Sequence, residues 1–171
     1  MKKLLNPVLF IGIAVILRLI PHMPNVAPIA AMALFGGVYL NKKYALIVPI
    51  LAMVFSDIFL GFNASTPMVY TSFFITGLIG LWLRKHKTFL LVIGASLFSS
   101  IIFYLLTNFN FWYATALYPK TFSGMIEAYL MGLPFFRNTI VGDLFYTGVL
   151  FGSYEFMLSL VKKSSFAKAT K

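Results

Sequence analysis

The sequence predicts an all-α integral membrane protein, and three observations support this: its composition, its apolar segments and the placement of its charges. The chain has 171 residues, of which 60% are hydrophobic and only 11% charged, a composition typical of proteins that contact lipid. Apolar runs follow one another along nearly the whole chain and leave no room for a separate soluble domain. We expect one transmembrane domain over residues 1–163 and a flexible cytoplasmic tail over residues 164–171.

Six apolar segments are predicted to be transmembrane helices. They cover residues 4–20, 26–40, 44–62, 67–83, 88–108 and 138–161. Most have the ~17–25 residues needed to cross a hydrocarbon core of about 30 Å. The second segment is short, so we expect it to be tilted, extended at one end or partly buried in protein.

The net charge of +10 is explained by topology. With both termini in the cytoplasm, the cations that precede, separate and follow the segments gather on the inner side, as the positive-inside rule requires. These cations are Lys2, Lys3, Lys42, Lys43, Arg84, Lys85, Lys87, Lys162, Lys163, Lys168 and Lys171. The pattern favours a multi-pass protein of the cell (inner) membrane and argues against nucleic-acid binding.

The first two segments are expected to form a helical hairpin. Two prolines within residues 21–24 stop the first helix, and Asn25 is a suitable N-cap for the return helix. That helix is rich in small residues, which let membrane helices approach closely. They include Ala27, Ala31, Ala33 and Gly37. Two interpretations of this small face stay open: internal packing, or docking of a partner protein.

The middle segments are joined by short turns. The third segment carries Asp57 near its outer end, and a turn at residues 63–67 returns the chain into the fourth segment. A cationic turn at residues 84–87 leads into the fifth segment, which we expect to close with Asn108. Short turns between long apolar runs are typical of antiparallel helices that neighbour one another.

The only long connection, residues 108–137, is rich in aromatic residues, which is not typical of disorder. Within it we expect a short helix over residues 125–133, lying at or dipping into the outer face. Arg137 and Asn138 then open the sixth segment, which carries Asp143 near its start.

Polar residues are predicted to meet in the outer third of the membrane. At a helical rise of about 1.5 Å per residue, Asp57 and Asp143 reach similar depths. Polar groups that converge in an apolar cavity are typical of a small-molecule site, and intramembrane acids are costly enough to suggest a function. The candidate binding residues are Arg18, Asp57, Asn108, Arg137, Asn138 and Asp143, with Trp112 and Tyr118 above them.

These residue types suit the recognition of a small molecule. An arginine would hold an anionic or carbonyl group, the aspartates would accept hydrogen bonds or orient the arginines, and the aromatic side chains would stack on a flat ring. A structural interpretation stays open for each of them. The aspartates and arginines would pair to hold the bundle together, the asparagines would cap helices, and the aromatic residues would form an interfacial belt.

Catalysis and cofactor binding find little support in the sequence. It has no His-Glu-x-x-His, no Gly-x-Ser-x-Gly and no glycine-rich phosphate loop, and it has no cysteine. His22 and His86 are predicted on opposite sides of the membrane, where they cannot share a metal ion. We expect no catalytic residues, no cofactor and no metal. A scaffold or accessory subunit, and an intramembrane enzyme acting on a lipid-phase substrate, remain alternatives to a substrate-binding protein.

Several motifs resemble a known group of transport proteins. Residues 18–25, 28–37 and 48–61 resemble the first half of the substrate-binding S components of energy-coupling-factor (ECF) vitamin transporters. The chain looks closer still to an uncharacterised six-helix family related to that fold, through residues 107–108, 118–119 and 134–144, which hold Thr-Asn, Tyr-Pro and a Pro-Phe-Phe-Arg-Asn to Gly-Asp-Leu stretch.

The resemblance implies a six-helix bundle whose cavity opens outward and binds a vitamin-like metabolite for uptake. Transport would require a separate transmembrane coupling subunit with ATPases. One departure leaves that partner open. S components present an Ala-xxx-Ala face on their first helix, whereas the first segment here offers only Gly12 and Ala14. The partners expected are therefore the substrate, membrane lipids and either this energising module or none.

Overall fold

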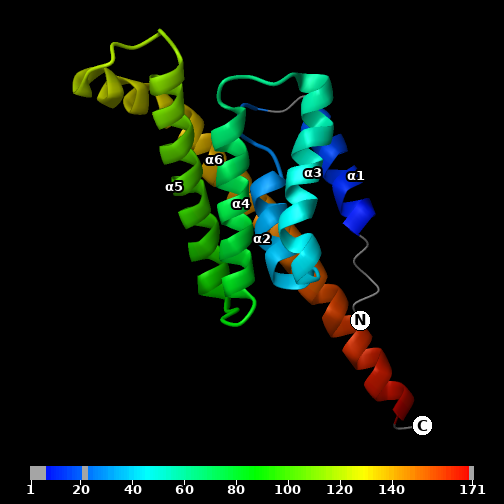
Figure 1. Ribbon diagram of the computed structural model, residues 1–171. Coiled ribbons are helices and arrows are strands. Elements are labelled where there is room, and N and C mark those ends of the chain that lie inside the picture. Colours follow the sequence, from blue (N-terminus) through cyan, green and yellow to red (C-terminus); the bar gives the residue numbers. More distant parts are fainter. Residues whose placement is uncertain (1–6, 21–22, 170–171) are drawn as a thin grey trace.

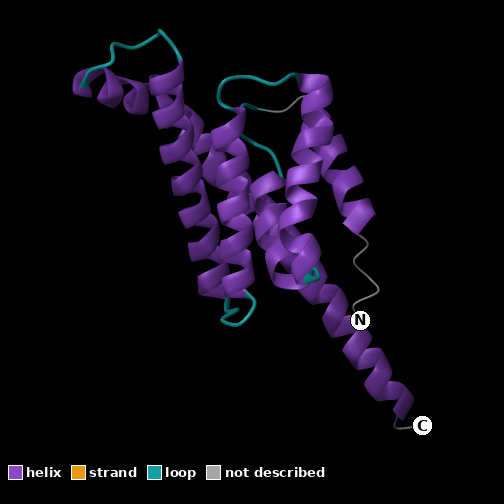
Figure 2. Ribbon diagram, in the orientation of Figure 1, coloured by secondary structure: helices purple, strands orange, loops and turns teal. Residues whose placement is uncertain are grey.

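The structure, a computed structural model, describes residues 7–20 and 23–169, with side chains described for residues 11–20 and 23–161. This part of the chain is all-helical, as predicted (Figure 1, Figure 2). Its helices are α1 (Pro7–Leu19), α2 (Ile29–Tyr39), α3 (Lys42–Leu60), α4 (Thr66–Leu83), α5 (Phe89–Ala114) and α6 (Phe122–Ala169).

Four of these helices, α3 to α6, are long and apolar enough to cross a membrane. Of the six predicted membrane spans, helix length therefore supports four. In the described residues, α1 has 13 helical residues and α2 has 11, fewer than the ~17 that a span requires. The start predicted for α1 at residue 4 lies outside the described residues. The backbone of α6 continues as helix to Ala169, through most of the predicted tail, whose flexibility stays a prediction.

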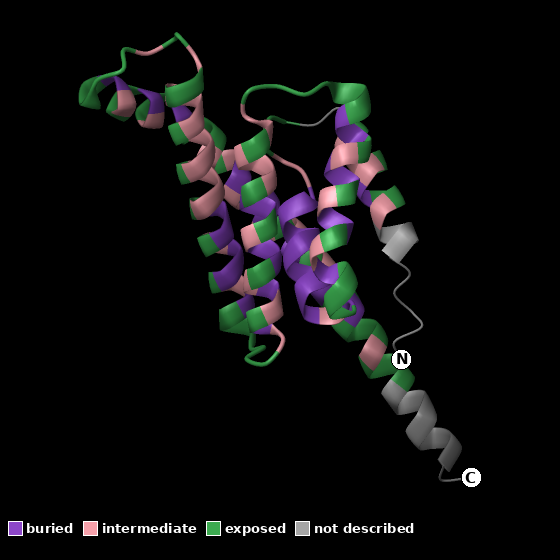
Figure 3. Ribbon diagram, viewed as in Figure 1, coloured by how far each residue is buried: buried purple, intermediate pink, exposed green. Residues whose placement is uncertain are grey.

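The short helix α2 lies at the centre of the bundle and contacts each of the other five helices. Every residue from Ile29 to Val38 is buried, and Figure 3 shows this helix as the most continuously buried element. A helix that is apolar on all sides is expected to be buried on all sides. The prediction that the second segment is partly buried in protein is confirmed.

The small residues of α2 serve internal packing against α4. A Cβ atom added at Gly37 would lie 2.5 Å from Cα of Gly80, and one added at Gly80 would lie 2.5 Å from the carbonyl oxygen of Leu34. Only glycine allows two backbones to come this close. Of the two interpretations of the small face, internal packing is confirmed for Gly37.

Arg84, just after the end of α4, binds the C-terminal end of α2. Its Nε and Nη2 atoms donate to the carbonyl oxygen of Gly37 at 3.0 and 2.7 Å, and Nη2 also donates to that of Leu40. The last carbonyl groups of a helix have no partner within it. A cation placed there satisfies them and favours the negative end of the helix dipole. Arg84 therefore caps α2 rather than being only a surface charge.

Two predicted boundaries are wrong. The fifth helix does not close with Asn108 but runs on to Ala114, because residues 109–114 contain neither proline nor glycine to stop it. The helix predicted at residues 125–133 exists, but it is the beginning of α6, so Arg137 and Asn138 lie inside that helix and do not open it.

Pro134 lies within α6 and explains the shape of this helix. A proline inside a helix removes one backbone hydrogen bond and causes a bend. In Figure 1 the beginning of α6 lies across the end of α5, and the remainder runs diagonally through the bundle. The helix expected at residues 125–133 and the span expected at residues 138–161 are therefore two arms of one bent helix.

We predict that Gly80→Ala destabilises the bundle by about 1–3 kcal/mol, the usual cost of overpacking a close contact. The reason is that the new Cβ would meet the backbone of Leu34. The matched control is Gly94→Ala on α5, where a Cβ would meet no atom within 4 Å. Thermal unfolding in detergent, followed by circular dichroism, measures both variants. Equal melting temperatures would contradict the tight α2–α4 contact.

Candidate functional site

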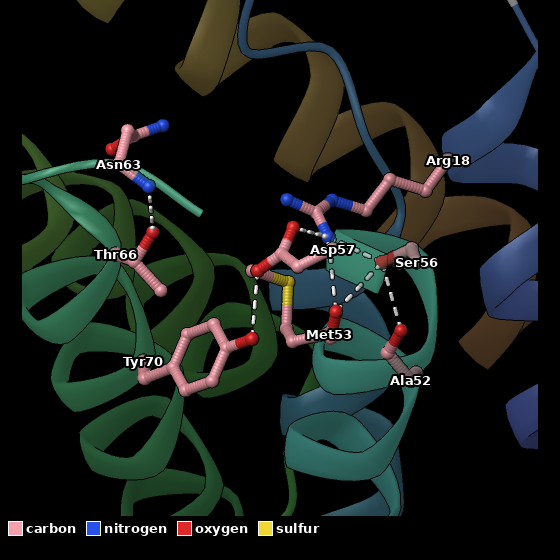
Figure 4. A network of polar contacts seen from close by, with 8 residues as sticks. All are labelled: Arg18, Ala52, Met53, Ser56, Asp57, Asn63, Thr66 and Tyr70. Atoms are coloured by element: carbon pink, nitrogen blue, oxygen red, sulfur yellow. Dashed lines mark hydrogen bonds and ion pairs between the residues drawn. The ribbon is translucent and has the colours of Figure 1, made fainter. Parts of the chain in front are cut away.

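The centre of the candidate site is an ion pair between α1 and α3. Arg18, in the last turn of α1, places Nη1 2.6 Å from Oδ1 of Asp57, in the last turn of α3 (Figure 4). The same nitrogen contacts Oγ of Ser56 and donates to the carbonyl oxygen of Met53 at 3.3 Å. The Asp57 side chain is only 5% exposed and that of Arg18 is 18% exposed, so solvent screens this pair weakly.

A third helix joins the pair through Tyr70 of α4. Its hydroxyl donates to Oδ2 of Asp57 at 2.7 Å, so both carboxylate oxygens have a partner and α1, α3 and α4 are tied together. Sequence reasoning did not identify Tyr70 or Ser56 as part of this cluster. A tyrosine within an apolar helix, 13 residues after an intramembrane acid, was the available signal, since a buried hydroxyl needs a partner.

The turn between α3 and α4 positions Asp57 and Tyr70 toward one another. The backbone N–H of Asn63 donates to Oγ1 of Thr66 at 3.0 Å, and its side-chain oxygen accepts from the N–H of Ser65 at 2.9 Å. Side chains that bond to nearby backbone in this way define tight turns. The short turn predicted at residues 63–67 is thereby confirmed, with α4 beginning at Thr66.

Asp143 of α6 has a different partner. It is buried and accepts a hydrogen bond from Oγ of Ser100 on α5 at 2.7 Å. One turn away, Ser96 and Thr147 are hydrogen-bonded at 3.3 Å. Small hydroxyl residues of this kind pair membrane helices closely. The interpretation that the aspartates pair with arginines is thus right for Asp57 and wrong for Asp143.

A cavity of about 410 Å³ lies beside these groups, and every helix contributes to its wall. Arg18 and Asp143 both line it, so the structure brings together polar residues that lie 125 positions apart in the chain. Most of the remaining wall is apolar. Its lining comprises Arg18, Leu19, Ile20, Asn25, Ala27, Ile29, Ala30, Met53, Leu60, Val69, Phe73, Phe103, Thr139 and Asp143. The volume and the few polar groups fit a small-molecule site.

The N-terminus of α2 opens on this cavity. Ile29 and Ala30 belong to its lining, and Pro28, at the N-cap position, forms no side-chain capping hydrogen bond. The prediction that Asn25 caps this helix is wrong: Asn25 adopts a left-handed backbone (φ 64°) and lies before the helix, against the cavity. First-turn N–H groups and the positive end of the helix dipole favour an anion or a carbonyl oxygen.

The two candidate asparagines are not part of the cavity lining. Asn108 donates to the carbonyl oxygen of Tyr104 at 2.8 Å and packs against Gly132 of α6. Asn138 donates to the carbonyl oxygen of Pro24 at 3.2 Å and so anchors the chain that leads into α2. Both residues were expected at helix ends. Because α5 ends later and α6 begins earlier than expected, Asn108 and Asn138 lie inside these helices.

The aromatic candidates and Arg137 also lie outside the cavity lining. Trp112 donates through Nε1 to the carbonyl oxygen of Pro119 at 2.9 Å, and the ring of Tyr118 packs against Phe111 with ring centroids 6.2 Å apart. Arg137 is exposed on α6. α5 continues to Ala114, so Trp112 lies within this helix, and the placement of Trp112 and Tyr118 above the site stays a prediction.

No residue set is assigned to a metal, since among the described residues no three His, Asp or Glu side chains gather. The structure thus defines a class: a helical membrane protein with a polar-ended cavity among its helices. A family model described as a family of unknown function, DUF6580, matches residues 1–167, and the chain belongs to this family. No curated protein and no solved structure matches it significantly.

We predict that the Arg18–Asp57 pair is strongly coupled in stability. Arg18→Met and Asp57→Asn should each destabilise the protein by roughly 3 kcal/mol, because removing one partner leaves a buried group unpaired. The double variant should cost clearly less than the sum of the two. Chemical unfolding of the three variants in detergent gives the coupling energy. Additive effects would show that the two groups act independently.

Proposed function

We propose that this protein binds a small metabolite with an anionic or carbonyl group, taken from the outer side of the membrane for uptake. The observation that carries the proposal is the cavity of about 410 Å³ to which all six helices contribute, with Arg18 and the N-terminus of α2 in its wall. Two positive features in one apolar cavity favour a ligand that brings negative charge to them.

The guanidinium of Arg18 has donors to offer such a ligand. The described contacts with Asp57, Ser56 and Met53 all use Nη1, whereas a guanidinium carries five N–H groups on three nitrogens. Asp57 therefore fixes the position of the arginine, and Nε and Nη2 remain for recognition. A second acid, Asp143, lines the same cavity and suits a hydroxyl or amide N–H of the ligand.

The orientation of the cavity follows from charge. Lys42 and Lys43 begin α3, and Arg84, Lys85 and Lys87 lie in the turn between α4 and α5. Both places are at the end of the bundle opposite Arg18. The positive-inside rule favours the cytoplasmic side for that end. We therefore propose that the cavity opens outward, that both termini are cytoplasmic and that the protein is multi-pass in the inner membrane. Residues 23–28 then enter the membrane as non-helical chain, which is tolerated where backbone lines a polar cavity.

A relation to ECF transporter S components is part of the proposal. It rests on the resemblance of residues 18–61 and on the cavity at the outer end of a six-helix bundle. The small-residue face of α2 is buried against α4 and cannot serve a coupling subunit. Such a subunit would sit instead on α1, which contacts only α2 and α3 among the described helices and exposes Ile13 and Ile16.

We predict that native mass spectrometry of the gently purified protein shows a single small metabolite bound. Val69→Phe, which adds volume to the cavity wall, should lower its occupancy several-fold. Val141→Phe is the matched control, because Val141 is exposed on α6 and outside the cavity lining. Melting temperatures of both variants verify that they are folded.

Two results would reject the proposal. One is a protein that carries no small molecule and gains no thermal stability from a panel of carboxylated and carbonyl-containing metabolites. The other is a bound metabolite whose occupancy is the same in the wild type and in folded Val69→Phe. Either result would favour a scaffold whose Arg18–Asp57–Tyr70 cluster is structural.

A further inference from the structure

A second cavity lies at the other end of the bundle, between α5 and α6. It measures about 670 Å³, larger than the candidate site. The two helices meet at the Ser100–Asp143 and Ser96–Thr147 contacts, and beyond these α6 runs diagonally away from α5 (Figure 1). A groove opens between them, with Tyr39 and Phe151 among its lining. We call it the α5–α6 groove.

The wall of the α5–α6 groove is apolar along most of its length and polar at one end. Val92, Ile93, Leu144 and Phe151 form apolar wall, and Gly148 and Gly152 keep it open, since a Cβ at either glycine would meet no atom within 4 Å. From Leu144 to Glu155 the helix rises about 16 Å. This is an extended apolar slot that ends at the turn 84–88, where a membrane interface is expected.

Charge and hydrogen-bond donors gather at the polar end of the groove. Lys87 forms an ion pair with Glu155, lies 3.1 Å from the hydroxyl of Tyr39 and sits 5.0 Å from the centroid of that ring. An ammonium has three N–H donors, so Lys87 keeps one beyond these two partners. Thr88 is the N-cap of α5, and its Oγ1 accepts from the N–H of Leu91 at 3.3 Å. The positive end of this 26-residue helix thus lies beside the lysine.

We propose that the α5–α6 groove binds a phospholipid, with one acyl chain along the slot and the phosphate at Lys87 and the N-terminus of α5. Acyl chains gain little hydrophobic free energy on leaving the bilayer for an apolar groove. Selectivity must therefore come from the phosphate contacts, where a lysine and a helix N-terminus suit an anion.

The nearby groove between α4 and α5 provides an internal comparison. It measures about 510 Å³ and is lined by apolar residues with Gly94 among them. It holds no charged side chain in its lining. Both grooves have mainly apolar walls, but of the two only the α5–α6 groove offers a partner for phosphate.

The test is native mass spectrometry of the full chain in detergent micelles doped with equal amounts of phosphatidylglycerol and diacylglycerol of identical chains. The wild type should retain the phospholipid and release the diacylglycerol. Lys87→Gln should weaken phospholipid binding about fivefold, the effect of one lysine beside an anionic lipid. Lys85→Gln, which removes the same charge from an exposed residue of the same turn, should not.

Gly148→Leu fills the slot and should abolish phospholipid retention, whereas Gly94→Leu fills the comparison groove and should leave it unchanged. Melting temperatures show that each variant is folded, and Lys87→Gln provides a second test if Gly148→Leu does not fold. Equal retention of the two lipids by the wild type would overturn the proposal. So would a dimer that is lost in Gly148→Leu while lipid retention stays the same, because a second copy of the chain would then occupy the groove.

Discussion

The structure depends on one constraint: α2 is a helix of 11 residues buried on every side, so both its ends must be satisfied inside the bundle. In an apolar medium, an unpaired backbone group costs several kcal/mol. The C-terminal end meets the guanidinium of Arg84, which reaches the carbonyl groups of Gly37 and Leu40. At the N-terminal end no described side chain caps the helix, and this end opens on the cavity beside Arg18. The C-terminal end of α2 is thus capped by Arg84, and its N-terminal end forms part of the candidate binding site.

The two clusters at opposite ends of the bundle illustrate different uses of charge. Asp57 holds Arg18 through one nitrogen, Nη1. The other nitrogens of the guanidinium are not used by this ion pair. Arg84 is held by backbone oxygens alone, where it stabilises a helix end. The two arginines thus differ in their partners: the carboxylate of Asp57 uses one nitrogen of Arg18, whereas backbone carbonyl groups use two nitrogens of Arg84.

The sequence was a good guide to the helices and a poorer guide to what they bring together. Apolar runs and charged turns located all six, because lipid solvent imposes length and polarity directly. The end of α5 and the beginning of α6 differ from the prediction, since aromatic residues neither stop nor require a helix, and Pro134 bends α6 without ending it. For the candidate site, the cost of intramembrane charge pointed to Arg18, Asp57 and Asp143. The structure places Arg18 beside Asp57 and places Arg18 and Asp143 at the cavity, and their role in binding stays a prediction. Tyr70 and the end of α2 were missed because their importance depends on contacts between distant segments.

The contact between Gly37 and Gly80 has a consequence for biogenesis. By itself α2 is too short to partition stably into a bilayer, and its last carbonyl groups find their donor only in Arg84, 47 residues further along the chain. We therefore expect stable insertion of α2 to follow the emergence of α4 during synthesis. The Gly37–Gly80 contact and the Arg84 hydrogen bonds would then form in the same step, when α4 docks against α2.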